Sequence, residues 1–332
     1  MAHRIEKRDK QQGREMGWHR LTEIVTDLNL ENNWLRKWDI QEVPLYINPN
    51  DNLTEVPFKV LTATDDYKVI GKPFATTYRP ISNKMFLDMI QEAISNIDGA
   101  TVESVGSVCN RGRVFVSISI KDYKKFNIGH REFNDYLNFG NGHDQTCVLW
   151  VNNTNICTVC NNTFTLNLHD KKSAINARVH HRGDIETSIT NIEEIIKGYF
   201  ESRDFFKQEF ERLMEQPLDT TGARNLFAGW TLRNDDDKML TVKSLNKVNR
   251  LTELFNTGAG NLGNSRADAF SAITDFFTHE STRKGGANTG NQFVSSEFGI
   301  GRSAKENFWN VVRDEELMVD YTTIGKFALE NV

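Results

Sequence analysis

The hydrophobic positions of this chain change their spacing near residue 170. Before that point, short runs of β-branched and aromatic residues alternate with polar residues and end at turn formers, a pattern typical of strands. After residue 185, apolar residues recur every three or four positions, which is the spacing of amphipathic helices. Because strands precede helices instead of alternating with them, we predict an α+β fold. An antiparallel, hairpin-rich sheet in the N-terminal half would pack on a long helix, and a helical C-terminal half would follow.

Strands are predicted in four segments: residues 44–80, 101–108, 113–120 and 148–168. Residues 123–145, with aromatic residues among polar residues and glycines, form a further strand or a long loop. In the last segment we place the hairpin turn at residues 152–155, because Asn tolerates positive φ and hydrogen-bonds its own backbone. Residues 110–112 suit a tight turn between the two middle strands. An apolar face over residues 86–97 predicts a helix that precedes these two strands, with Ser82 or Asn83 as its N-cap.

The longest helical pattern runs from Ile185 to Leu213, with Asp184 as its N-cap. Arg203 is the one polar residue in the apolar stripe of this helix. At about 1.5 Å per residue, the helix would be about 45 Å long. Further helices are predicted after it at residues 223–230, 242–255, 265–280 and 303–317.

The length of the chain and the change in its pattern predict one or two domains. We divide the 332 residues into an N-terminal arm (1–40), an α+β core (41–215) and a helical C-terminal region (216–332), with a flexible Gly-rich loop at residues 285–291. The N-terminus is charged, and no run approaches the roughly 20 apolar residues of a membrane span. We therefore expect a cytoplasmic protein without a signal peptide and without membrane contact.

The net charge of −5 argues against a protein that is basic over its whole surface, so contact with nucleic acid would require a local patch. Such a patch is predicted after residue 110, where cations and aromatic residues interleave: Arg111, Arg113, Lys121, Tyr123, Lys124, Lys125, Phe126 and Arg131. Cations that neutralise phosphates beside rings that stack on bases form sequence-tolerant single-strand sites. We expect Tyr123 and Phe126 to stack on bases, and Arg178 and Arg182 to extend the patch. The alternative is a solvated hairpin face with core aromatics.

Metal sites are a further alternative. Three cysteines lie close together in the sequence: Cys147, Cys157 and Cys160. The last two have the spacing of half a zinc site, but in an extended strand they would point to opposite faces. Buried, unreactive cysteine is the commoner outcome, so we assign no metal and no cofactor. His181, Asp184 and Glu186 would suit a metal-dependent nuclease, although a simple helix cap explains Asp184 as well.

Several short motifs occur in the order found in one known family: Gly17–Leu21, Tyr67–Gly71, Tyr78–Asn83, Gly112–Val116, Thr158–Thr163 and Val179–His181. With these motifs, the chain resembles the phage/plasmid-like proteins that carry the domain of unknown function 932. Residues 263–278 resemble the late helix of that family, but they lack its usual Trp and carry Arg266 and Phe270 nearby. The resemblance implies a gene of a bacteriophage or a conjugative plasmid, and hence a place in the host cell's cytoplasm. It implies no established activity.

The sequence favours a binding protein over an enzyme, because it contains no catalytic motif whose mechanism we can name. The loop Gly258–Gly263 follows a helical pattern and not a strand, so it is not a dinucleotide-binding loop. We expect a protein that binds single-stranded DNA. Strand annealing in DNA recombination, carried out by a homo-oligomeric ring or filament, is one version of this function. The main alternative is a protein-interaction factor that binds a host protein, for example to block a host defence.

Overall fold

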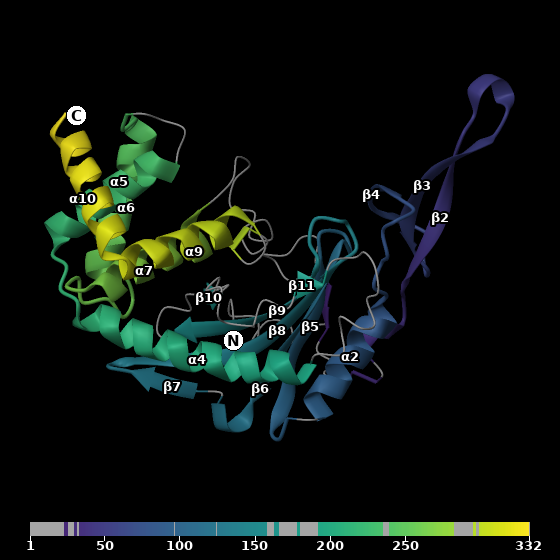
Figure 1. Cartoon of the computed structure of the whole chain (residues 1–332), viewed down its shortest axis with the longest axis horizontal. Coiled ribbons are helices and arrows are strands. Elements are labelled where there is room, and N and C mark those ends of the chain that lie inside the picture. Colours follow the sequence, from purple (N-terminus) through teal and green to yellow (C-terminus); the bar gives the residue numbers. More distant parts are fainter. Residues whose placement is uncertain are drawn as a thin grey trace.

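The computed structural model describes residues 23–25, 30–31, 33–95, 97–123, 125–157, 163–165, 178–179, 192–234, 239–281, 295–296 and 299–331. Its centre is an antiparallel sheet of eight strands, in the order β1-β5-β6-β8-β9-β10, with β7 paired to β8 and β11 paired to β9 (Figure 1). The strands are β1 (Glu23–Val25), β5 (Ala100–Val108), β6 (Arg113–Ile120), β7 (Lys125–Ile128), β8 (Arg131–Gly142), β9 (Leu149–Cys157), β10 (Thr163–Thr165) and β11 (Arg178–Val179). Strands fill the N-terminal half and helices the C-terminal half, which confirms the predicted α+β class.

The helices α2 (Asn83–Ser95) and α4 (Ile192–Glu215) cover one face of this sheet (Figure 1). Ser82 caps α2, because its Oγ accepts a hydrogen bond from the backbone N–H of Met85 at 3.1 Å. The predicted stripe of α4 is confirmed by its buried members: Tyr199, Phe206, Phe210 and Leu213. The predicted start of that helix at Asp184 lies outside the described residues. Tyr199 belongs to the core around α2 and Phe206 to the core of the helical half, so α4 connects the two cores.

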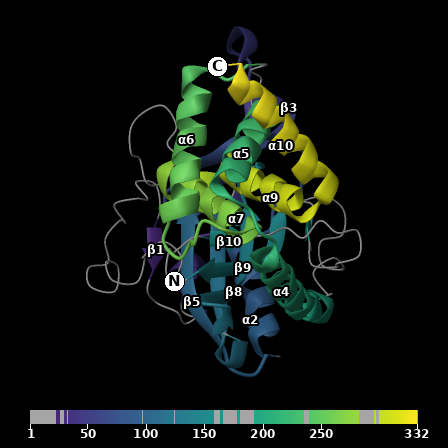
Figure 2. The same ribbon diagram turned by 90° about the vertical axis from the view of Figure 1, so that its left-hand side faces the viewer.

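The described residues of the C-terminal half form five helices and a short π-helical turn: α5 (Thr220–Asn234), α6 (Val242–Thr257), α7 (Arg266–Asp275), η5 (Phe276–Glu280), α9 (Ile300–Arg313) and α10 (Glu315–Glu330). In Figure 2, α5, α6 and α10 stand above α7 and α9, which lie between them and the sheet. Two glycines let α5 and α10 pack closely. A Cβ on Gly229 would lie 1.9 Å from the carbonyl oxygen of Tyr321, and one on Gly325 would lie 1.8 Å from that of Asn225.

For the helix predicted at residues 303–317, the predicted C-terminal boundary was wrong. The chain leaves the helix at Asp314, which has extended backbone angles, and a new helix runs to Glu330. Asp314 starts this helix because its side chain accepts a hydrogen bond from the backbone N–H of Leu317 at 3.0 Å. Asp314, which lies inside a continuous helical pattern in the sequence, therefore separates two helices as an N-cap.

The hairpin turn predicted at residues 152–155 was also wrong. The strand β9 continues through these residues, and Thr154 pairs with Tyr136 of β8. The side chains of Asn153 and Asn155 are buried in the sheet. Pairing with β8 on one side and β10 on the other therefore overrides the turn preference of Asn. The hairpin partner of β9 is β10, which begins at Thr163.

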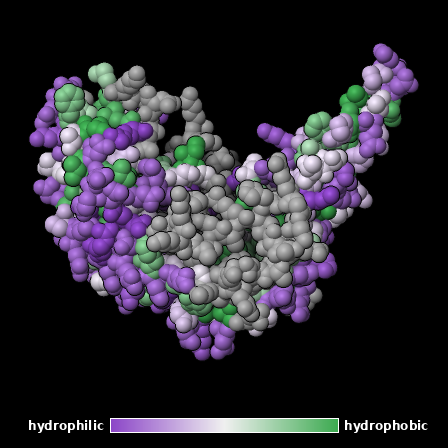
Figure 3. All heavy atoms as spheres, in the orientation of Figure 1, coloured by the Kyte–Doolittle hydropathy of each residue, from purple (hydrophilic) through white to green (hydrophobic). Residues whose placement is uncertain are grey.

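A second sheet of three strands projects from the body (Figure 1). It consists of β2 (Ile40–Ile47), β3 (Thr54–Ala63) and β4 (Val69–Ala75), and we call it the projecting arm. Figure 3 shows apolar side chains along it. The exposed large apolar residues of the arm are Tyr46, Ile47, Leu53, Phe58, Tyr67 and Val69. Each of its strands contains one proline: Pro44 in β2, Pro57 in β3 and Pro73 in β4. The pairing register also shifts once between β2 and β3 and once between β3 and β4.

Candidate nucleic-acid interface

Strand β6 separates the predicted cations into two groups. Arg113 begins this strand, and Lys121 follows its end. At about 3.4 Å per residue, the two positions lie about 27 Å apart. The predicted single patch is therefore two separate sites. Lys124 and Arg182 lie outside the described residues, and Arg178 is placed by its backbone alone, opposite Trp150 of β9.

The first group lies at the turn between β5 and β6. Arg111 stacks on the ring of Trp38 at 4.8 Å and forms an ion pair with Asp65 at 2.7 Å. Arg113 donates to Oγ1 of Thr146 at 2.6 Å and lies 3.6 Å from a carboxylate oxygen of Asp144. Both guanidinium groups are thus neutralised by local carboxylates. They fasten this turn to the adjacent loops and contribute little net positive charge.

The second group remains exposed. The short 3-10 helix η4 (Lys121–Tyr123) carries Lys121 and Tyr123 on the surface, and Lys125 follows in β7. The ring of Tyr123 is 39% exposed and packs against Phe200 of α4, with 4.7 Å between ring centroids. Lys125 forms an exposed ion pair with Glu132 at 2.9 Å, a type of pair that is worth little and breaks readily. Lysines therefore flank a braced aromatic ring that contacts solvent.

Phe126 cannot stack on a base, which corrects its predicted role. The side chain is 9% exposed and stacks on Phe133, with 5.4 Å between centroids. Its other ring neighbour is Phe206 of α4. Burial alternates along β7, so that Phe126 points into the core while Lys125 points out.

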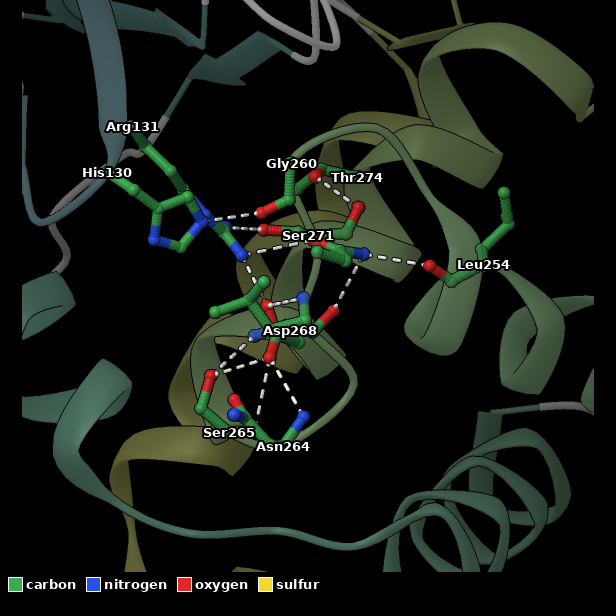
Figure 4. Close-up of polar contacts among 11 residues, drawn as sticks. His130, Arg131, Leu254, Gly260, Asn264, Ser265, Asp268, Ser271 and Thr274 are labelled. Carbon is green, nitrogen blue, oxygen red and sulfur yellow. Dashed lines mark hydrogen bonds and ion pairs between the residues drawn. The ribbon is translucent and has the colours of Figure 1, made fainter.

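Arg131 is also corrected, because it lies 2% exposed in the core and cannot reach phosphates (Figure 4). It forms a buried ion pair with Asp268 of α7 and donates to Ser271 Oγ at 2.5 Å. Asp268 also accepts hydrogen bonds from the backbone N–H groups of Asn264 and Ser265, each at 3.1 Å. The ion pair thus ties the start of β8 to the start of α7.

A buried polar cluster lies directly behind Tyr123. The guanidinium of Arg203 lies 5.3 Å from the Tyr123 ring and 4.8 Å from that of Phe126. Its Nε is 3.1 Å from Oδ2 of Asp135, to which the Tyr199 hydroxyl donates at 2.9 Å. Burial raises the pKa of Asp135 to about 7, and the hydrogen bond from Tyr199 and the charge of Arg203 oppose that rise.

The sequence pattern contains a signal for this cluster, although no function was predicted for its residues. Arg203 is the polar interruption of the α4 stripe. Asp135 occupies an inward position of β8 between the buried residues Phe133 and Leu137. A cation and a carboxylate at apolar positions, such as Arg203 and Asp135, indicate a buried ion pair. Only the fold shows that these two side chains meet.

The metal hypotheses find no support in the part of the chain that the structure describes. No group of three or more His, Cys, Asp or Glu side chains there is placed to hold a metal ion. Cys160 and the predicted nuclease residues His181, Asp184 and Glu186 lie outside it, so those alternatives stay predictions. Among the described helices, none is long and apolar enough to span a membrane.

Comparison with known protein families gives one match. Residues 73–307 match the family described as "Domain of unknown function (DUF932)". This range includes α2, the strands β5 to β11, α4 and most of the helical half, and thus both groups into which the predicted cations divide. No curated protein and no solved structure matches the chain. The match covers more than half of the sequence, and the chain therefore belongs to the family defined by the domain of unknown function 932.

Proposed function

We propose that this protein binds single-stranded DNA at the Tyr123 patch, which comprises Lys121, Tyr123 and Lys125. Lys124, which the sequence predicts as a further phosphate contact, lies outside the described residues. The observation that carries the proposal is the exposed ring of Tyr123 between exposed lysines. Phe200 and Arg203 brace this ring from behind, so little side-chain entropy is lost when a base stacks on it. The lysines would neutralise the neighbouring phosphates. Arg111 and Arg113 lie at the other end of β6, where local carboxylates neutralise them. The contacts predicted for Arg178 and Arg182 stay predictions.

Strand annealing in recombination is the concrete version that we favour. Stacking and phosphate contacts do not depend on sequence, as annealing of arbitrary strands requires. The chain resembles phage and plasmid proteins, and mobile elements often encode their own proteins for handling single strands; this step is an analogy. Annealing proteins of this kind would act in the host cytoplasm as rings or filaments, which head-to-tail contacts between copies generate.

A salt series with a labelled single-stranded oligonucleotide, beside its duplex, tests the proposal. We expect binding that prefers the single strand and weakens with salt. Tyr123→Ala should weaken it about tenfold, because stacking on one ring is worth about 1–3 kcal/mol, whereas Tyr123→Phe should bind like the wild type. Lys121→Glu with Lys125→Glu should lower the slope of log K against log salt by about 1.4, for two lost phosphate contacts.

The matched control is Lys243→Glu with Lys326→Glu, which changes the net charge equally at exposed positions of α6 and α10. This control should retain wild-type affinity. Equal losses in both double variants would mean that overall charge and not the Tyr123 patch governs binding. Absence of binding at low salt would overturn the proposal.

A protein-interaction factor is the second candidate, and the projecting arm favours it. Exposed apolar side chains such as Leu53, Tyr67 and Val69 are typical of protein contacts. This candidate predicts a stable complex with a host protein and no salt-sensitive binding of single strands. The same salt series therefore separates the two functions.

A further inference from the structure

Building on the proposed function, we propose that Arg203 is an additional nucleic-acid contact at the Tyr123 patch. Its guanidinium would exchange the carboxylate of Asp135 for a phosphate when Asp135 takes up a proton. Binding of the single strand at this site would then be regulated by pH.

The position of Arg203 supports a direct contact between its guanidinium and a phosphate. Its guanidinium lies beside the exposed Tyr123 ring, on the side of α4 that faces η4 and β7. The side chain is 13% exposed. Its Nε faces Asp135, and its Nη1 edge lies 3.5 Å from the exposed carboxylate of Asp204. A base stacked on Tyr123 brings its phosphate to within a side chain's length of this edge. Arg suits this role because its planar fork binds phosphate while it stacks on rings.

The surroundings of Asp135 support its control over the charge of Arg203. From α4 it is faced by Tyr199 and Arg203, and from β9 by the amides of Asn153 and Asn155. Tyr123 of η4 lies beyond Arg203. Asp204, which is 66% exposed, is the other carboxylate near Arg203, at 3.5 Å. Asp135 is fully buried, so Arg203 is the cation that compensates its charge.

The sign of the pH dependence follows from this pairing. Burial raises the pKa of Asp135 to about 7. Above that pH the ionised carboxylate holds and neutralises Arg203, and below it the neutral acid releases one positive charge at the patch. Binding of a single strand should therefore be tighter at pH 6 than at pH 8, by about tenfold or more for one charge-assisted contact.

Binding of a labelled single-stranded oligonucleotide at pH 6 and pH 8 tests this inference in the full chain. Asp135→Asn should bind at pH 8 as tightly as the wild type binds at pH 6, and its affinity should not change between these pH values. Arg203→Gln should bind more weakly than the wild type at pH 6, by about tenfold or more, and should also lose the pH dependence. A purely structural role for Asp135 would instead weaken binding in the Asn variant.

Tyr199→Phe provides a second variant if Asp135→Asn does not fold. It removes a hydrogen bond that lowers the pKa of Asp135, so the midpoint of the pH dependence should move to higher pH. Wild-type binding that is equally tight at both pH values, or an unchanged midpoint in Tyr199→Phe, would overturn the inference and leave the proposed function intact. Absence of wild-type binding at both pH values would overturn both.

Discussion

Replacing Asp268 with Asn is expected to lower the free energy of unfolding by about 3–5 kcal/mol, because it leaves Arg131 as an uncompensated charge in the core. Arg131 and Asp268 are each 2% exposed, so water cannot replace the lost partner. The carboxylate also accepts backbone hydrogen bonds at the start of α7, and an amide can accept from fewer donors. Denaturant unfolding at neutral pH measures the change.

The exposed ion pair between Arg233 and Asp320 provides a matched control for the Asp268 variant. Its side chains are 40% and 46% exposed, so Asp320→Asn should cost less than about 1 kcal/mol. The double variant Arg131→Met with Asp268→Leu should recover part of the lost stability, because it removes both buried charges together. A loss below about 1 kcal/mol in Asp268→Asn would show that the ion pair does not fasten the sheet to the helical half.

Replacing Gly325 with Ala is expected to destabilise the protein by about 3 kcal/mol or more. The new methyl group would lie 1.8 Å from the carbonyl oxygen of Asn225 and would overlap the backbone of α5. A backbone atom cannot turn away as the end of a side chain can, so the whole helix must shift. Thermal unfolding measures the effect as a lower midpoint.

Gly222→Ala in α5 is the appropriate comparison for the Gly325 variant. Its new methyl group would meet the flexible side chain of Leu218, and Ala favours a helix over Gly by about 1 kcal/mol. This variant should be as stable as the wild type or slightly more so. Similar losses in both variants would contradict the close packing of α5 against α10.

Elements that depend on local signals could be predicted from the sequence. The helix α2 has its apolar stripe and its cap within one stretch of the chain, and Ser265 begins α7 with a capping box formed with Asp268. The path of β9 could not be predicted in this way. Its Asn residues have a strong turn preference, and only the folded sheet shows that pairing with β8 and β10 overrides this preference.

The candidate site was only partly predictable for the same reason. Tyr123 and Lys121 are exposed as expected, because a short polar helix leaves them at the surface. Arg131 has the same charge as its neighbours, and only a partner 137 residues away, Asp268, makes it a core residue. The charge pattern of one segment therefore predicts which cations could form a patch. It does not predict which carboxylates from other segments neutralise them.

The prolines of the projecting arm have a consequence for the solubility of the protein. A long apolar hairpin with free edges is normally a template on which further chains add strands and aggregate. Proline has no N–H to offer such a chain, and the shifted registers beside β3 interrupt the regular ladder that strand addition requires. The arm can therefore expose its apolar side chains while its backbone resists growth into fibres.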